Sequence, residues 1–274
     1  MATAARRCEK AKKSMPTVDL KSADLAEKRA DPDDLLSLYK YLRVADVCDA
    51  LDSLGHFDLH LMSEEVRPLW NGMKFWGTAA TIRCVPSNKP MWPLATNAEV
   101  VDSHSIWFEK VGYVALPETL APGHVIVMDT GGSGEVGAWG SANTLAVVAA
   151  GAVGIVTDGY CRDTEEVVLQ RSPVCSRGRG RTLIPGRIEF IEVQTTIACG
   201  GVQVRPGDVV GCDDDGVIVV PAEIAEQVAV IARAVLIADM VVRRKHYAEL
   251  GMEADGTVDV ETVQAYYSAV ESAV

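Results

Sequence analysis

The stretch Pro122-Gly-His-Val-Ile-Val-Met-Asp-Thr-Gly-Gly-Ser-Gly-Glu-Val-Gly-Ala-Trp-Gly-Ser-Ala-Asn-Thr-Leu-Ala146, continued by Gly151-Ala-Val-Gly-Ile-Val-Thr-Asp-Gly-Tyr-Cys-Arg-Asp163, decides the fold of this 274-residue chain. Residues 125–128 form a short apolar run rich in β-branched side chains, closed by Asp129 and paired glycines, which is typical of a buried strand that feeds a loop. Residues 153–157 repeat this pattern and predict a second buried strand. The stretch therefore runs from strand to glycine-rich loop to helix to strand, and it ends on the pair Arg162-Asp163.

A helix is predicted between these two strands. Ser141 is expected to cap it and Gly151 to stop it. Its small apolar face consists of Ala142, Leu145, Ala146 and Ala149. Together the three elements form a βαβ unit, whose crossover should be right-handed. The glycine-rich loop and the Arg-Asp pair then lie at the carboxyl ends of parallel strands, where α/β sheets bind their ligands.

Composition and charge describe an acidic globular protein. The chain is long enough to bury a full core, and hydrophobic and charged fractions of 48% and 23% are ordinary for a soluble domain. The formal net charge is −12, with a pI near 4.9, and no dense basic stripe occurs beyond the first few residues. Because phosphate affinity depends on clustered Lys and Arg, binding to nucleic acid is disfavoured.

Cysteine spacing and the apolar runs bear on compartment. The seven cysteines are widely spaced, odd in number and without a Cys-x-x-Cys pair, which favours reduced thiols in a cytoplasmic protein. The longest apolar run, residues 228–242, contains Arg233 and Asp239 and is shorter than the roughly 18 residues of a membrane span. Residues 1–30 are basic and lack an apolar segment, so we expect a mobile N-terminal arm, with an organellar transit peptide as the alternative to it.

Outside the central stretch, caps, apolar periodicity and turn residues place the other elements. Asp31 is expected to cap a helix that Pro32 starts. Further helices are predicted over residues 46–54, 96–108, 222–250 and 259–274, and strands over 76–85, 197–204 and 209–220. The Arg-Gly-Arg-Gly-Arg run at 177–181 is expected to be a basic loop, either a solvated turn or a contact for an anion.

Three groups of polar residues invite a functional interpretation that the sequence does not favour. His56 and His60 have the spacing of metal ligands on a helix, but Gly55 indicates a turn, so we expect surface histidines. The three aspartates at 213–215 precede Gly216 and predict a turn rather than a metal site. His104 is expected to pack or to lie on the helix surface rather than to act in catalysis.

The glycine-rich loop also matches a dinucleotide fingerprint. Gly132, Gly134 and Gly137 fit G-x-G-x-x-G after a strand, and Asp158 lies near the distance expected for a ribose-binding acid. The fingerprint needs its third glycine inside the helix that packs on the strand, whereas Gly137 is followed by Ala-Trp-Gly before any helix can begin. No further βαβ units complete a nucleotide-binding sheet, so a NAD or S-adenosylmethionine site is the disfavoured alternative.

The pair Arg162-Asp163 favours a different chemistry. Arginine offers a planar fork suited to a carboxylate, and the free N–H groups at the start of the helix near Gly140 offer a second anion contact. Asp163 can hold one hard divalent cation, because Mg²⁺ is often bound by one or two protein carboxylates together with waters and substrate oxygens. Such a site would bind a 2-oxo acid, although an Arg-Asp dipeptide also occurs as a surface ion pair or a helix cap.

The same residues resemble a known family. Gly140-Ser-Ala-Asn-Thr-Leu-Ala146, Gly154-Ile-Val-Thr-Asp-Gly159 and Arg162-Asp163 are similar to the core of the class II pyruvate aldolases that act on 4-hydroxy-4-methyl-2-oxoglutarate and 4-carboxy-4-hydroxy-2-oxoadipate. That family also contains the regulator of ribonuclease activity A. The resemblance extends from about Val44 to Pro221, some two thirds of the chain.

The resemblance implies a swivelling β/β/α domain of the α/β class, assembled as a homotrimer or homohexamer with sites at subunit interfaces. It implies that Gly140, Ser141, Ala142 and Asn143 bind substrate, that Arg162 binds the pyruvyl carboxylate, and that Asp163 ligates Mg²⁺ or Mn²⁺. On this basis we divide the chain into an arm (1–30), a family domain (31–221) and C-terminal helices (222–274). The expected function is a metal-dependent aldolase or oxaloacetate decarboxylase that releases pyruvate, with Arg162 and Asp163 as its catalytic residues.

One position departs from the family. The aldolases usually have Asp or Glu where this chain has Ser141, and a hydroxyl can bind a water but cannot take a full proton from it. Asp158, Glu135 and an acid from a neighbouring subunit are the candidates for that role. A non-catalytic protein-binding regulator and a metal-dependent hydroxy-acid dehydratase are the alternative functions.

Overall fold

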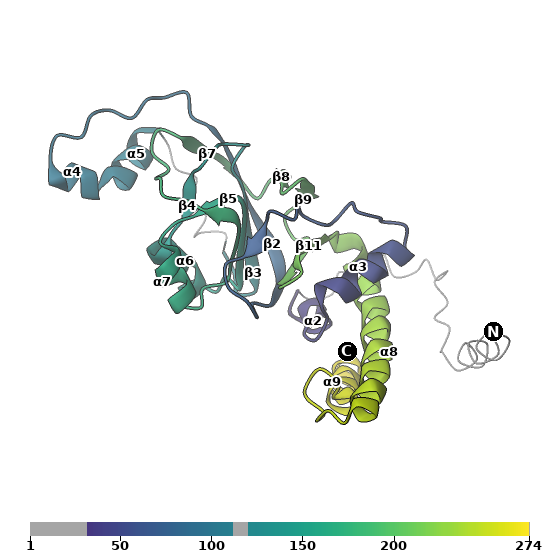
Figure 1. Ribbon diagram of the computed structural model, residues 1–274. Coiled ribbons are helices and arrows are strands. Elements are labelled where there is room, and N and C mark those ends of the chain that lie inside the picture. The colour runs from purple at the N-terminus through teal and green to yellow at the C-terminus, as the bar shows by residue number, and fades with distance from the viewer. Residues whose placement is uncertain (1–31, 112–119, 274) are drawn as a thin grey trace, which may run out of the picture. The chain divides into compact units, whose positions relative to one another are not determined.

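The computed structural model describes residues 32–111 and 120–273 (Figure 1). The predicted N-terminal arm, the capping role of Asp31 and Cys8 lie outside the described residues. The helices are α2 (Pro32–Ser37), α3 (Val44–Ser53), α4 (Asn97–Val101), α5 (Ser103–Val111), α6 (Ser141–Ala149), α7 (Thr164–Leu169), the 3-10 turn η2 (Ala222–Ile224), α8 (Ala225–Leu250) and α9 (Val260–Ala273). The strands are β1 (Arg67–Pro68), β2 (Phe75–Pro86), β3 (His124–Asp129), β4 (Gly137–Trp139), β5 (Gly154–Cys161), β6 (Val174–Arg179), β7 (Ile188–Val193), β8 (Ile197–Cys199), β9 (Val202–Val204), β10 (Val209–Asp213) and β11 (Gly216–Val220).

A mixed sheet organises these elements. Its order is β1-β6-β5-β3-β2-β10-β11, with β4 paired to β5 and β7 paired to β2, while β8 and β9 form a separate hairpin. Strands β2, β3, β5 and β6 run parallel, as the βαβ pattern predicts, and β10 and β11 add an antiparallel hairpin. The outer strands β1 and β11 approach one another, so the sheet nearly closes into a barrel. The predicted α/β class is confirmed.

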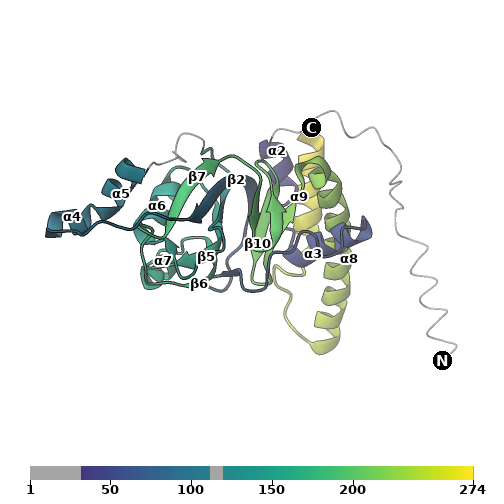
Figure 2. The same cartoon turned by 90° about the horizontal axis from the view of Figure 1, so that it is seen from above.

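Alternation along the strands divides the core between the inside and the outside of this sheet. On β3, Val125 and Val127 face the interior cluster, whereas Ile126 and Met128 face the cluster beneath α5 and α7. On β11, Val217 and Val219 face the interior cluster, whereas Ile218 and Val220 face the cluster formed with α3, α8 and α9. The Cys175 and Cys212 thiols meet 3.0 Å apart inside the barrel, and all six described cysteines are free. Figure 2 shows the two helical groups on opposite sides of the sheet.

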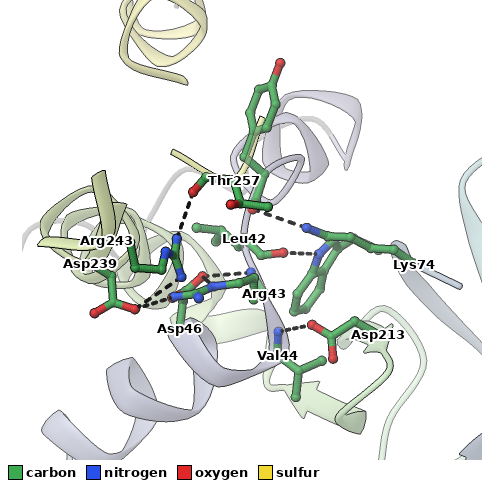
Figure 3. A network of polar contacts seen from close by, with 11 residues as sticks. Leu42, Arg43, Val44, Asp46, Lys74, Asp213, Asp239, Arg243 and Thr257 are labelled. Atoms are coloured by element: carbon green, nitrogen blue, oxygen red, sulfur yellow. Dashed lines mark hydrogen bonds and ion pairs between the residues drawn. The ribbon is translucent and has the colours of Figure 1, made fainter. Parts of the chain in front are cut away.

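The C-terminal helices pack on the family domain through both apolar and polar contacts. Val263 and Tyr267 of α9 are buried in the same cluster as α3 and α8. Arg43, at the N-terminus of α3, bonds the buried carboxylate of Asp46 through its backbone N–H (2.9 Å) and side chain, and it also pairs with Asp239 of α8 at 2.9 Å (Figure 3). The described residues therefore form one compact unit. The predicted division at residue 221 stays a prediction.

Replacing Asp46 by Ala should lower the free energy of unfolding by about 2 kcal/mol, because it removes the N-terminal cap of α3 and leaves the guanidinium without its buried partner. Arg43 is one-third exposed, which keeps the loss below that of a fully buried pair. Urea unfolding measures the change. The control Asp239→Ala removes the exposed partner and should cost no more than about 0.5 kcal/mol; equal losses in both variants would contradict this assignment.

Several local predictions need correction. The predicted helix 96–108 is capped by Thr96 but breaks at Asp102, whose backbone leaves the helical region, and resumes as α5. The predicted strand 197–204 is the hairpin β8–β9, because Gly200 and Gly201 both adopt positive φ and turn the chain. Residues 177–179 of the predicted basic loop continue β6, which pairs with β5 through Gly178 and Arg179.

The other predicted elements agree with the structure to within a few residues. The turn at Asp214-Asp215 connects β10 to β11, and the carboxylate of Asp214 accepts a hydrogen bond from the Gly72 N–H at 2.7 Å. His56 and His60 are half-buried rather than surface residues, with Nδ1 of the first 3.0 Å from Nε2 of the second. Within the described residues, no helix combines the length and hydropathy that crossing a bilayer requires.

Candidate functional site

Arg162 and Asp163 connect the end of β5 to the start of α7. Asp163 occupies the N-cap position of α7 with φ 52° and ψ 38°, and its side chain makes no capping hydrogen bond. Left-handed backbone geometry is uncommon outside glycine, although Asp and Asn tolerate it better than other residues. Its carboxylate therefore does not cap the helix it precedes and is available for another role. The Arg162 Nε donates to Asp163 Oδ1 at 3.2 Å, and both side chains are about one-third exposed.

Two glycines bring the glycine-rich loop against this pair. A Cβ on Gly140 would lie 2.6 Å from Asp163 Oδ2 and 3.1 Å from the Cγ of Arg162. A Cβ on Gly137 would lie 3.1 Å from the Cβ of Arg162. Since contacts this short exclude a side chain at either position, the aliphatic part of Arg162 lies directly on the loop backbone. The structure thus brings together Gly140 and the Arg-Asp pair, which are 22 residues apart in sequence.

The N-terminus of α6 completes this group. Gly140 is its N-cap and Ser141 its first residue, so the prediction that Ser141 caps the helix is wrong. The reason is steric, since only glycine fits at the cap beside Asp163. Ser141 is half-buried, and Ala142 and Asn143 are exposed. No described residue forms a hydrogen bond with the side chain of Ser141 or Asn143, so both are available to a ligand beside the first N–H groups of the helix.

The donor set of the site fits one hard cation. Oδ2 of Asp163 has no hydrogen-bond partner among the described residues, and a carboxylate oxygen is the ligand type that Mg²⁺ and Mn²⁺ prefer. Across residues 32–111 and 120–273, no three His, Cys, Asp or Glu side chains gather as a metal-binding group. Asp163 therefore suits a cation that keeps waters and takes substrate oxygens, and the described residues do not form the group of several ligands that a closed structural zinc site needs.

The two acids that the sequence offers near Ser141 are both engaged. Asp158 is buried, and its Oδ1 accepts hydrogen bonds from the N–H and the hydroxyl of Thr130 at 2.9 and 2.8 Å. Glu135 bonds the guanidinium and the N–H of Arg181, and these contacts lower the pKa of Glu135 to about 2. A carboxylate so strongly held as an anion is a poor proton acceptor. Glu135 is therefore unsuited to replace the missing family carboxylate, and Asp158 is buried with Oδ1 bonded to Thr130.

The geometry also disagrees with the dinucleotide alternative. Gly137 begins strand β4 and not a helix, and it faces Arg162. Asp158 lies within β5, is buried, and accepts the hydroxyl of Thr130 on Oδ1. In the basic run at 177–181, Arg177 pairs with Glu65 at 3.3 Å and Arg181 with Glu135 at 2.7 Å, whereas Arg179 is exposed.

From the sequence, His104 was expected to pack or to lie on the helix surface rather than to act in catalysis. His104 of α5 lies close enough to Arg162 for that positive charge, after the larger effect of burial, to lower the pKa of its imidazole. Its Nε2 is buried and has no hydrogen-bond partner among the described residues. The proximity depends on the packing of α5 against the sheet, which no local pattern in the sequence reports.

Comparison with known proteins agrees with the geometry. The family model Aldolase/RraA matches residues 44–219, which contain every residue of the candidate site. The chain is 28% identical over 195 residues to a putative 4-hydroxy-4-methyl-2-oxoglutarate aldolase of Halalkalibacterium halodurans, covering 69% of this chain and 77% of that protein. It is 29% identical over 185 residues to protein DlpA of Legionella pneumophila, where the match covers 67% of this chain but only 27% of that longer relative.

A solved structure shows the same fold. The structure of Streptomyces coelicolor RraAS2, described as an unusual member of the RNase ES inhibitor RraA protein family, superimposes with a TM-score of 0.59 at 24% identity. The alignment covers 82% of this chain and 98% of that structure. The chain has a nearly closed sheet with the strand order given above and a βαβ unit that ends on Arg162-Asp163, and the family model matches residues 44–219. The protein therefore belongs to the Aldolase/RraA family.

Proposed function

We propose that this protein is a divalent-metal-dependent carbon–carbon lyase that releases pyruvate from a 2-oxo acid. The observation that carries the proposal is the convergence of Arg162, Asp163 and the N-terminus of α6 around Gly140. An arginine fork, a carboxylate with a free oxygen and a set of helix N–H groups are the parts that a 2-oxo acid and a hard cation need. The name of the Halalkalibacterium relative supports the same reaction class.

Each group has a separate task in this proposal. Arg162 binds the substrate carboxylate through paired hydrogen bonds and thereby fixes the direction of the carbon chain. Asp163 would hold Mg²⁺ or Mn²⁺, which when bound supplies Lewis-acid stabilisation of the negative charge that develops on the keto oxygen. The N–H groups and side chains of residues 141–143 orient the remaining oxygens of the substrate. Among the described residues the side chain of Arg162 hydrogen-bonds only Asp163, so the substrate carboxylate competes for the guanidinium with that one partner.

The reaction is tested by a screen of substrates that share the pyruvyl unit. Purified protein with Mg²⁺ or Mn²⁺ should release pyruvate from oxaloacetate and from a subset of 4-hydroxy-2-oxo acids, measured with coupled lactate dehydrogenase. The leaving fragment of the best substrate identifies the physiological class. Absence of pyruvate from every compound in the screen would contradict the lyase proposal and favour a binding function.

Ser141 should limit aldol cleavage more than decarboxylation. Aldol cleavage requires removal of a proton from the 4-hydroxyl, whereas oxaloacetate loses CO₂ without one. We expect Ser141→Glu to raise kcat for aldol cleavage by about tenfold and to leave decarboxylation within about twofold, since general-base catalysis contributes factors of this order or more. Ser141→Gln has the same length without the charge and serves as the control. An unchanged or lower aldolase rate in the Glu variant would mean that Ser141 serves a different substrate.

A second candidate function is a protein-binding regulator, since the Streptomyces protein is a member of an RNase ES inhibitor family. The apolar face of α6 supports contacts with another chain, because Ala142, Ala146 and Ala149 are exposed, Leu145 is 45% exposed, and Leu169 of α7 is 77% exposed.

We propose that copies of this chain cover that face in a homotrimer or homohexamer. Light scattering on the eluted peak of a sizing column should then give three or six chain masses, and a single chain mass would contradict the assembly.

A further inference from the structure

A short segment after β6 is bonded to the glycine-rich loop beside the candidate site. The carboxylate of Glu135 accepts hydrogen bonds from the N–H of Arg181 at 2.7 Å and from its guanidinium at 3.0 and 2.7 Å. The hydroxyl of Thr182 donates to the backbone carbonyl of Glu135 at 2.5 Å. Residues 181–182 are therefore bonded both to the side chain and to the backbone of one residue in the loop that leads into β4.

This segment reaches the side chain of Arg162. A Cβ placed on Gly137 would lie 2.6 Å from the carbonyl oxygen of Thr182, and 3.1 and 3.2 Å from the Cβ and Cδ of Arg162. Because these three atoms surround the same point, the Thr182 carbonyl and the stem of Arg162 lie next to one another over Gly137. The N–H of Gly180 also donates to the carbonyl of Cys161 at 2.8 Å, which bonds the segment to the residue before Arg162.

The guanidinium of Arg162 depends on such contacts for its direction. Its side chain is about one-third exposed and has one hydrogen bond among the described residues, to Asp163 at 3.2 Å. A planar guanidinium binds a carboxylate through paired hydrogen bonds only when it is correctly oriented, and a side chain that is already restricted loses less freedom on binding. The contacts with Gly137 and the Thr182 carbonyl supply that restriction to the stem of Arg162.

We propose that Glu135 and Arg181 are positioning residues, which hold the Thr182 carbonyl against the stem of Arg162 and so orient its guanidinium for the substrate carboxylate. The inference rests on the proposed lyase function, and neither residue touches the substrate. The side chain and the N–H of Arg181 lower the pKa of Glu135 to about 2, so the pair stays charged in an assay near neutral pH.

Arg181→Ala and Glu135→Ala should both raise KM for oxaloacetate about fivefold, which is the size of effect that an exposed ion pair can supply, and leave kcat within about twofold. The two variants change the net charge in opposite directions. A purely electrostatic effect on an anionic substrate would therefore raise KM in Arg181→Ala and lower it in Glu135→Ala. Steady-state kinetics with Mg²⁺ present measure both parameters.

A double-mutant cycle tests whether the pair acts through Arg162. In the Arg162→Ala background, Arg181→Ala should lower kcat/KM by less than about 1.5-fold, because the side chain that it positions is absent. A general structural role would give the same fivefold loss in both backgrounds. Arg181→Lys keeps a positive charge and a donor for Glu135, so it should restore KM to within about twofold of the parent protein.

Glu223→Ala is the matched control. Glu223 accepts two hydrogen bonds from the guanidinium of Arg205, one of them at 2.8 Å, and this exposed pair joins the turn before β10 to η2, which carry no residue of the candidate site. The loss of this pair removes an ion pair of the same kind as the Glu135–Arg181 pair. Its KM and kcat should equal those of the parent protein.

The outcomes separate this inference from the proposed function. A parent protein that releases no pyruvate overturns both. A parent protein that does release pyruvate overturns the positioning role alone if KM is unchanged in the two variants, if KM moves in opposite directions, or if the loss is the same without Arg162. Thermal unfolding identifies a misfolded variant; Glu135→Gln, which keeps the shape of the side chain, then replaces Glu135→Ala with the same direction of change expected.

Discussion

Asp163→Asn should lower kcat for pyruvate release about 1,000-fold and remove the response to added Mg²⁺ or Mn²⁺. The amide keeps the shape of the side chain and tolerates the left-handed backbone at φ 52°, so the variant should fold normally. The variant loses the negative charge that would hold the cation. Without the cation, the negative charge that develops on the substrate oxygen in the transition state is less stabilised, and losses of such stabilisation lower kcat by factors of about 100 to 1,000. Steady-state kinetics over a metal titration measure the effect.

Asp58→Asn is the matched control for this variant, because Asp58 also has a positive φ of 56° and is exposed away from the site. It should leave both rate and metal response unchanged. If Asp163→Asn kept its metal dependence with a normal rate, the carboxylate that holds the cation would lie elsewhere, and the assignment of Asp163 would be wrong.

Arg162→Ala should act mainly on substrate binding. The variant removes a charge-assisted pair of hydrogen bonds to the substrate carboxylate, and their loss should raise KM about 100-fold, which corresponds to about 3 kcal/mol. A smaller fall in kcat should accompany it, because a substrate that is no longer held by its carboxylate is less well oriented. Initial rates over a wide range of oxaloacetate concentrations separate the two parameters.

Arg179→Ala provides the control for net charge. Arg179 is exposed, and in the β5–β6 pairing it lies opposite Cys161, the residue before Arg162. The Arg179→Ala variant therefore removes one positive charge close to the site and leaves the guanidinium of Arg162 in place. Its KM should change less than threefold. Equal increases of KM in the two variants would indicate a diffuse electrostatic effect rather than a direct contact of Arg162 with the carboxylate.

The core of the fold is predictable because its signals are local. Residues 125–128 and 153–157 are short runs rich in β-branched apolar residues beside glycines, which favours buried strands, and the structure pairs β3 with β5 in parallel. The long helix after Pro221 follows from its apolar periodicity and its glycine stop at Gly251, which adopts φ 66°. The turn at 213–216 follows from aspartates before a glycine.

The corrections concern features that depend on contacts distant in sequence. Ser141 fits the rules for a cap, but the approach of Asp163 to the backbone of Gly140 leaves space for glycine alone. The lowered pKa of His104, caused by burial and then by the charge of Arg162, depends on how α5 packs and not on any local pattern in the sequence. The left-handed backbone of Asp163 results from the joining of β5 to α7, and composition does not report it.

The metal requirement of pyruvate release tests the central claim most directly. Protein treated with a chelator and then freed of it should release no pyruvate from oxaloacetate above the uncatalysed rate. Addition of Mg²⁺ or Mn²⁺ should restore release, with the response absent from Asp163→Asn. Pyruvate release by the chelated protein at the full rate, unaffected by added metal, would contradict the account.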